Sequence, residues 1–215
     1  MADSAIDLCN LALLRVGEAF ITDFSDGTTT ADACAKLYPL VRDTSLQRHT
    51  WPWAMCRQAL ARLAVTPPSD FAYYYALPTD PAVLQLVDFD LGAADVPYRE
   101  EIATILHGEG PTETQRVIAT DATSALLTYL GRTGEAMWPP LFGQLVMLDL
   151  ARQLCAVLTG KASLAALLSQ EWADLESRLA HIAARGHSPR MLRLPDTYIA
   201  VRGAGSSAAP TRDEW

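Results

Sequence analysis

The most apolar stretch of the chain, residues 141–158, reads LFGQLVMLDLARQLCAVL. Its apolar side chains recur at helical spacing and cover well over half of the helix circumference. A helix that is apolar on most sides is buried, so we expect a central core helix from about Glu135 to Thr159. Asp149 and Arg152 place two charges inside this stretch, which makes it a poor membrane span.

A second long helix is predicted directly after the central one. Gly160 suits the left-handed residue that follows a helix, and Ser163 can cap the next helix. That helix ends at Gly186, and its apolar stripe consists of Leu164, Leu168, Trp172, Leu175, Leu179 and Ile182. Because the connection is only three residues long, we expect the two helices to pack antiparallel.

Three further helices are predicted on the N-terminal side. The first spans residues 4–16, and the second spans residues 28–49 with a kink at Pro39. A third is expected over residues 52–66, because Pro52 suits the first turn of a helix.

From residue 70 to residue 133 the pattern changes to short stretches rich in β-branched and aromatic residues, separated by turn-like segments. The predicted strands are residues 71–75, 83–89, 98–106, 114–119 and 124–130. Only residues 120–123 separate the last two, which favours an antiparallel hairpin. We therefore expect four or five strands in a small sheet inserted between two helical halves.

These elements predict a mainly α fold, a bundle of four to five helices with a small inserted antiparallel β lobe. The bundle comprises residues 1–69 and 134–186, and the β lobe comprises residues 70–133. Residues 187–215 contain prolines and a Gly/Ala/Ser-rich run, yet they keep apolar side chains in short stretches. That pattern favours an extended C-terminal arm that folds onto a partner.

Composition limits the possible functions. The chain has 215 residues, of which 50% are hydrophobic, so general disorder is excluded. A net charge of −8 disfavours a dedicated nucleic-acid-binding module and binding to anionic membranes. Lys36 and Lys161 are the only lysines among 17 basic residues, and this arginine bias suits interfacial ion pairs or reflects a GC-rich genome. The four scattered cysteines and the acidic N-terminus favour free thiols in a reducing cytoplasm.

Residue types that carry chemistry are not grouped in useful patterns. His49 and Cys56 are seven residues apart, but two ligands do not make a metal site. Glu100 and Glu101 in a strand point to opposite faces and cannot act as a paired acid and base. We expect no catalytic residues, no cofactor and no metal.

The aromatic residues are more informative. Trp51 and Trp53 beside a helix start are expected in the core or at a subunit interface, as is Trp172 in the stripe of the last helix. Tyr74 lies in a run of three tyrosines that places rings on both faces of a strand. One face could be covered by the helices and the other by a neighbouring chain.

Several motifs follow one another in a recognisable order. They are the helix end Leu14-Arg15-Val16-Gly17, the Tyr38-Pro39 helix, Trp53-Ala54, the turn Leu77-Pro78-Thr79-Asp80 and the helix segment Leu148-Asp149-Leu150-Ala151. Over about residues 4–185, this order resembles the phage head–tail adaptor family called tail tubular protein A, whose members are also known as gatekeeper or head-completion proteins.

The resemblance implies a structural virion protein and not an enzyme. Members of that family form a homo-oligomeric ring, usually of twelve copies, beneath the portal protein at the neck of the virion. The ring extends the channel for packaged DNA, which passes through without sequence-specific binding, and it offers a platform to the tail or nozzle protein. Assembly would take place in the host cytoplasm, without a membrane. A negative net charge would help the channel wall to repel DNA.

Within this interpretation, the β lobe is expected to face the tail and the C-terminal arm to bind the portal. The expected portal-binding residues are Arg190, Leu192, Tyr198, Ile199, Val201 and Trp215. Two other classes remain open. One is a different neck or tail-completion protein, such as a connector or tail terminator, and the other is a cytoplasmic helical regulator or enzyme.

Overall fold

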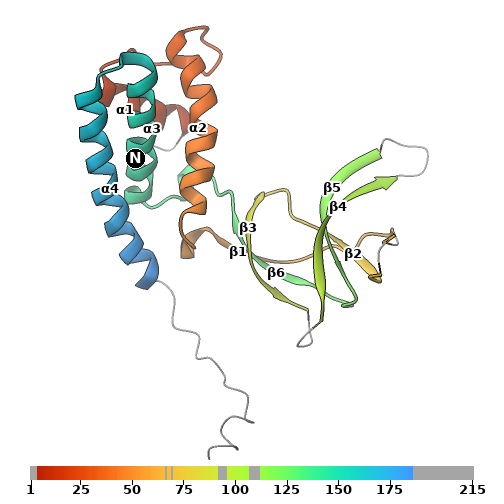
Figure 1. Ribbon diagram of the computed structural model, residues 1–215. Helices are drawn as coiled ribbons and strands as arrows, with labels where there is room; N and C mark the ends of the chain where they lie inside the picture. Colours follow the sequence, from red (N-terminus) through yellow and green to blue (C-terminus); the bar gives the residue numbers. More distant parts are fainter. Residues whose placement is uncertain (1–3, 66, 69, 92–95, 107–111, 186–215) are drawn as a thin grey trace, which may run out of the picture.

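The computed structural model describes residues 4–65, 67–68, 70–91, 96–106 and 112–185. Within these residues, four α-helices form one part of the molecule and six strands form the other, as Figure 1 shows. The strands make two three-stranded antiparallel sheets. The prediction of a mainly α bundle is therefore wrong, because the chain has an α+β fold whose sheets form a part with cores of their own.

The first two helices match their predicted positions and carry the expected end signals. Helix α1 spans Ala5–Val16, and the Ser4 side chain accepts a hydrogen bond from a backbone amide of its first turn. Gly17 ends it with a φ of 85°, in the left-handed region that favours glycine. Helix α2 spans Thr29–Gln47 and is capped in the same way by Thr28.

The predicted core helix lies at the centre of the helical part. A 3₁₀ turn (η2, Glu135–Met137) leads into helix α3, Pro140–Leu154, which continues as a π-helical turn (η3, Cys155–Thr159). Gly160 follows with a φ of 60°, and helix α4, Ala162–Arg185, runs back antiparallel along α3. Helix α3 packs against α1, α2 and α4 (Figure 1), which explains why it is apolar around most of its circumference.

The helix predicted over residues 52–66 does not form in its described part, residues 52–65. Pro52–Ala54 is a single 3₁₀ turn (η1), and strand β1, Met55–Ala59, follows at once. Strand β1 pairs antiparallel with β6, Leu126–Gly131, which lies about seventy residues later in the chain. Local helix propensity is a weak preference, and this distant pairing overrides it. The β part of the molecule therefore begins at Met55 and not at Asp70.

The predicted hairpin between the last two strands is also wrong. The other strands are β2 (Tyr73–Ala76), β3 (Val83–Asp90), β4 (Tyr98–Leu106) and β5 (Thr112–Thr120). One sheet has the order β1-β6-β3 and the other has the order β2-β5-β4. The short segment after β5 thus carries the chain from one sheet to the other, and β6 finds its partners elsewhere.

The two sheets share a core, and β6 connects that core to the helices. Tyr75 and Ile118 from one sheet pack with Leu127 and Tyr129 from the other. Because side chains alternate along a strand, Leu130 points the other way, and it belongs to the core of the helical part. Strand β6 is therefore buried on both faces where the two parts meet.

Candidate interaction site

The tryptophans expected in the core or at a subunit interface lie in different surroundings. Trp51 is 2% exposed, and its ring lies 5.1 Å from that of Phe142 in α3. The half-buried Trp53 and the buried Trp138 lie 4.8 and 5.0 Å from the same ring. Phe142 is thus surrounded by three indoles, and this aromatic cluster fixes the start of α3 against the end of α2.

Tyr74 and Tyr75 lie on opposite faces of β2 and are both buried. The Tyr74 ring packs with Val117 and Ala119 in a small core of its own sheet, and its hydroxyl donates to Glu101 over 2.9 Å. The Tyr75 ring belongs to the core between the sheets. Within the described residues, the β part itself covers both rings, with no need for the helices or a second chain.

Trp172 in α4 is half-buried between two guanidinium groups, those of Arg48 at 4.6 Å and Arg152 at 4.7 Å from the ring centroid. The buried carboxylate of Asp149 accepts hydrogen bonds from Arg152 and Gln153, each over 2.9 Å. This network of polar contacts connects the end of α2 with α3 and α4, so it stabilises the packing of these three helices.

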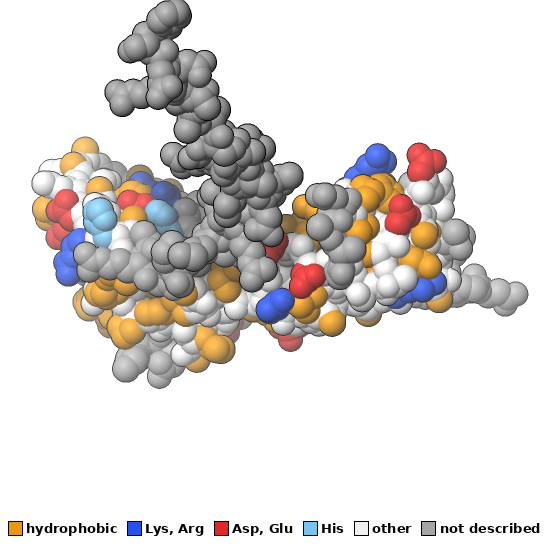
Figure 2. Space-filling view, turned by 90° about the horizontal axis from the view of Figure 1, so that it is seen from below, with side chains coloured by type: hydrophobic (Ala, Val, Ile, Leu, Met, Phe, Trp, Pro, Cys, Tyr) orange, Lys and Arg blue, Asp and Glu red, His pale blue; other side chains and the backbone are white. Residues whose placement is uncertain are grey.

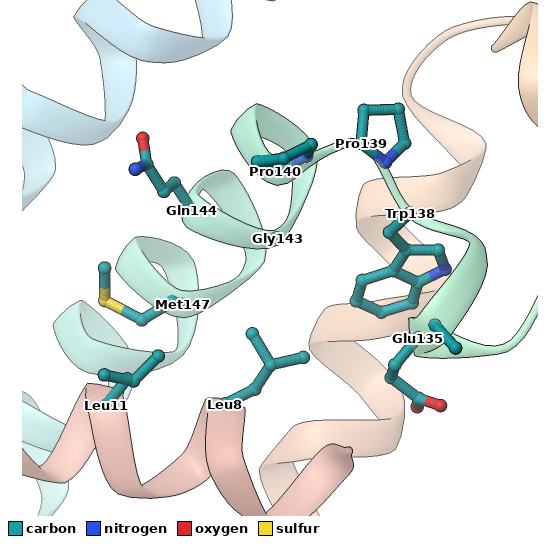
Figure 3. Close-up of a pocket in the computed structure, with 10 residues that line it drawn as sticks. Leu8, Leu11, Glu135, Trp138, Pro139, Pro140, Gly143, Gln144 and Met147 are labelled. Atoms are coloured by element: carbon teal, nitrogen blue, oxygen red, sulfur yellow. The ribbon is translucent and has the colours of Figure 1, made fainter. Parts of the chain in front are cut away.

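An apolar groove lies between α1 and the start of α3. Figure 3 shows Leu8 and Leu11 of α1 on one side, and Trp138 and Met147 on the other. Its volume is about 290 Å³. Gly143 lies in the wall of the groove, and a Cβ atom built on it would meet a single neighbour, Cδ2 of Leu8 at 3.9 Å. The absence of a side chain at this position therefore leaves the groove open.

Four exposed apolar side chains belong to residues that line the groove or are close to its lining residues in the sequence. Leu11 is 43% exposed and Leu14, one turn later on α1, is 60% exposed. Met137 is 69% exposed and Leu141 is 37% exposed, and both lie beside groove residues in the chain. We call these four residues and the groove the apolar face. Figure 2 shows hydrophobic side chains gathered on the helical part.

The groove contains few polar groups. Glu135 and Gln144 supply a carboxylate and an amide. The buried Tyr38 hydroxyl donates to Glu135 over 2.5 Å, and burial, followed by this carboxylate, raises the pKa of Tyr38. In the part of the chain that the structure describes, no three His, Cys, Asp or Glu side chains are grouped as a metal site would require. The groove is suited to binding an apolar side chain and offers no nucleophile paired with a base.

Sequence reasoning missed this groove. The residues expected to bind the portal, Arg190, Leu192, Tyr198, Ile199, Val201 and Trp215, all lie outside the described residues. Two signals for the groove were nevertheless present. One is a glycine inside the most apolar helix, and the other is the pair Leu11 and Leu14, which lies off the buried face of α1.

Helix α3 and its π-helical turn, Pro140–Thr159, are long and apolar enough to cross a membrane, with a mean hydropathy of 1.5. Half of this stretch is buried inside the protein, since α3 is also the core helix. The chain matches no protein-family model and no curated protein.

Proposed function

We propose that this protein is a phage head–tail adaptor, a structural subunit that forms a ring beneath the portal and carries the tail. The proposal combines the order of motifs described above with one structural observation, the apolar face. Four large apolar side chains exposed next to an open groove are typical of a surface that binds protein.

The arrangement of the molecule is compatible with such a ring. A head-to-tail ring requires two different, complementary surfaces on each subunit, and the apolar face offers one of them. The β part extends away from the helices (Figure 1), so it can contact a tail or nozzle protein while the helices contact one another. The net charge of −8 suits a channel wall along which packaged DNA slides.

In this proposal the ring contains twelve copies, and residues 187–215 bind the portal. The protein would act in the virion neck after assembly in the host cytoplasm, with no enzymatic activity and no cofactor. A cytoplasmic regulator or enzyme, in contrast, would not be a component of the virion.

Electron cryo-microscopy of purified virions tests the proposal. A ring beneath the portal into which this fold can be built is the expected result. A chain lacking residues 187–215 should keep its circular dichroism spectrum and fail to co-assemble with portal protein. Absence of the protein from mature virions, or turnover of a small metabolite by the isolated subunit, would refute the adaptor function.

A further inference from the structure

Gly143 lowers the stability of helix α3, and the packing of the fold does not explain why a glycine is present there. Glycine inside a helix is less stable than alanine by about 1 kcal/mol, yet an alanine Cβ would meet only Leu8 here, at an ordinary contact distance of 3.9 Å. Folding alone would therefore favour a larger residue. An open groove at this position is useful when another side chain fills it.

The chain leaves the helical part at the same end as the groove. Helix α3 with its π-helical turn has 20 residues, and it starts at the groove. Helix α4 returns antiparallel and has 24 residues, so it reaches the level of Pro140 and its last turn extends past the start of α3 (Figure 1). Residues 186–215 thus continue from a point close to this end of the bundle.

The sequence that follows α4 complements the groove chemically. Residues 190–194 read RMLRL, with Met191, Leu192 and Leu194 as apolar side chains between two arginines. The groove has apolar walls and carries the carboxylate of Glu135 at one end. Apolar residues flanked by arginines match an apolar groove with an acidic group at its margin.

We propose that the groove of one copy binds residues 190–194 of a neighbouring copy, with Leu192 inserted above Gly143. This inference rests on the proposed ring and identifies its subunit contact. It narrows the portal-binding part of residues 187–215, because Arg190 and Leu192 would bind the neighbouring subunit instead and Tyr198 to Trp215 would remain to bind the portal. The two surfaces of the contact differ, as a head-to-tail ring requires.

Sedimentation velocity of the full chain over a concentration series tests this contact. Gly143→Leu should fill the groove, and Leu192→Asp should place a charge on the inserted segment. Each variant should weaken self-association at least tenfold, because each prevents the burial of a leucine-sized side chain. An equimolar mixture of the two variants should form heterodimers, since one copy supplies an intact groove and the other an intact segment.

Two controls separate binding from folding. Gly143→Ala adds only a Cβ atom, so it should raise the stability of the helix and weaken association less than Gly143→Leu does. Val157→Ser removes a side chain that is 66% exposed on η3, away from the groove, and should leave association unchanged. Circular dichroism should show the same helix content for all four variants.

Three outcomes would overturn the inference. They are undiminished association of Gly143→Leu, a full chain that stays monomeric at every concentration, and a Leu192→Asp variant that speeds hydrogen exchange around Gly143 in a monomer. The last outcome would mean that the segment binds within its own copy. If any of them occurs while the chain still forms a ring on the portal, the adaptor function stands and only this contact is wrong.

Discussion

The hydroxyl group of Tyr38 in α2 donates a hydrogen bond of 2.5 Å to the carboxylate of Glu135, 97 residues later in the chain. Glu135 belongs to the 3₁₀ turn that leads from the β part back to the helices. This bond therefore positions the segment from which both the groove and helix α3 begin.

Tyr38→Phe should lower the free energy of unfolding by about 1–2 kcal/mol, because it removes a hydrogen bond to a charged group and leaves the packing of the ring intact. Urea denaturation followed by circular dichroism measures the change. Tyr98→Phe is the matched control, since that ring is 50% exposed, and its effect should be close to zero.

The same tyrosine should make stability depend on pH. Burial raises the pKa of Tyr38 in the folded state, so the folded protein holds this proton more tightly than the unfolded chain does. Its contribution is complete below the ordinary tyrosine pKa of about 10 and is lost as the pH rises above it. The stability difference between the unmodified chain and Tyr38→Phe should therefore shrink between about pH 9 and pH 11. A constant difference across that range would contradict the assignment.

Asp149→Ala should be among the most destabilising single changes in the helical part. The carboxylate is 1% exposed and accepts hydrogen bonds from Arg152 and Gln153, so its loss leaves a guanidinium without its anion. We expect a cost of about 2–4 kcal/mol, since Arg152 is partly exposed and can be hydrated. Thermal unfolding measures it, and Asp174→Ala at an exposed position of α4 should change stability by less than about 0.5 kcal/mol.

Gly131→Ala should destabilise the junction between the two parts by about 1–3 kcal/mol. A Cβ atom there would lie 2.9 Å from Sγ of Cys56 and 3.1 Å from Cγ of Pro81, so the neighbours must move. Gly134→Ala is the control, because its Cβ would meet nothing within 4 Å. Combining Gly131→Ala with Cys56→Ala should restore part of the lost stability in chemical denaturation, and no restoration would argue against this clash.

The four cysteines should differ sharply in reactivity. Cys9, Cys34 and Cys155 are fully buried, whereas Cys56 is partly exposed. The hydrogen bond with Cys34 and burial raise the pKa of the Cys9 thiol, which keeps it protonated and unreactive. Ellman's reagent should therefore titrate one thiol per native chain and four in denaturant. Rapid reaction of Cys9 or Cys34 in the native protein would show that the contact between α1 and α2 opens.

The sequence-based predictions are correct where a structural feature depends on residues close together in the sequence, and they are wrong where it depends on contacts between distant segments. Ser4, Gly17 and Thr28 mark the ends of α1 and α2 because a cap depends on residues within one turn. Strand β1 was not predicted, because Met55–Ala59 carries no strand pattern and becomes a strand only through pairing with β6. The groove was not predicted for a similar reason, since Gly143 and Leu8 lie 135 residues apart in the sequence and neither residue is unusual by itself.

By itself, the amino-acid sequence determined helices α1 to α4, although it also predicted a fifth helix that does not form, and it determined the apolar character of α3 and the presence of a strand-rich segment in the middle of the chain. These features depend on periodicity and on capping residues that act over a few positions. Only the tertiary structure decided that β5 and β6 belong to different sheets, that Trp51 and Trp53 pack around Phe142, and that Gly143 opens a groove against α1. Each of those depends on contacts between distant segments, whose free energy exceeds local preference and is not encoded in any single stretch of the chain.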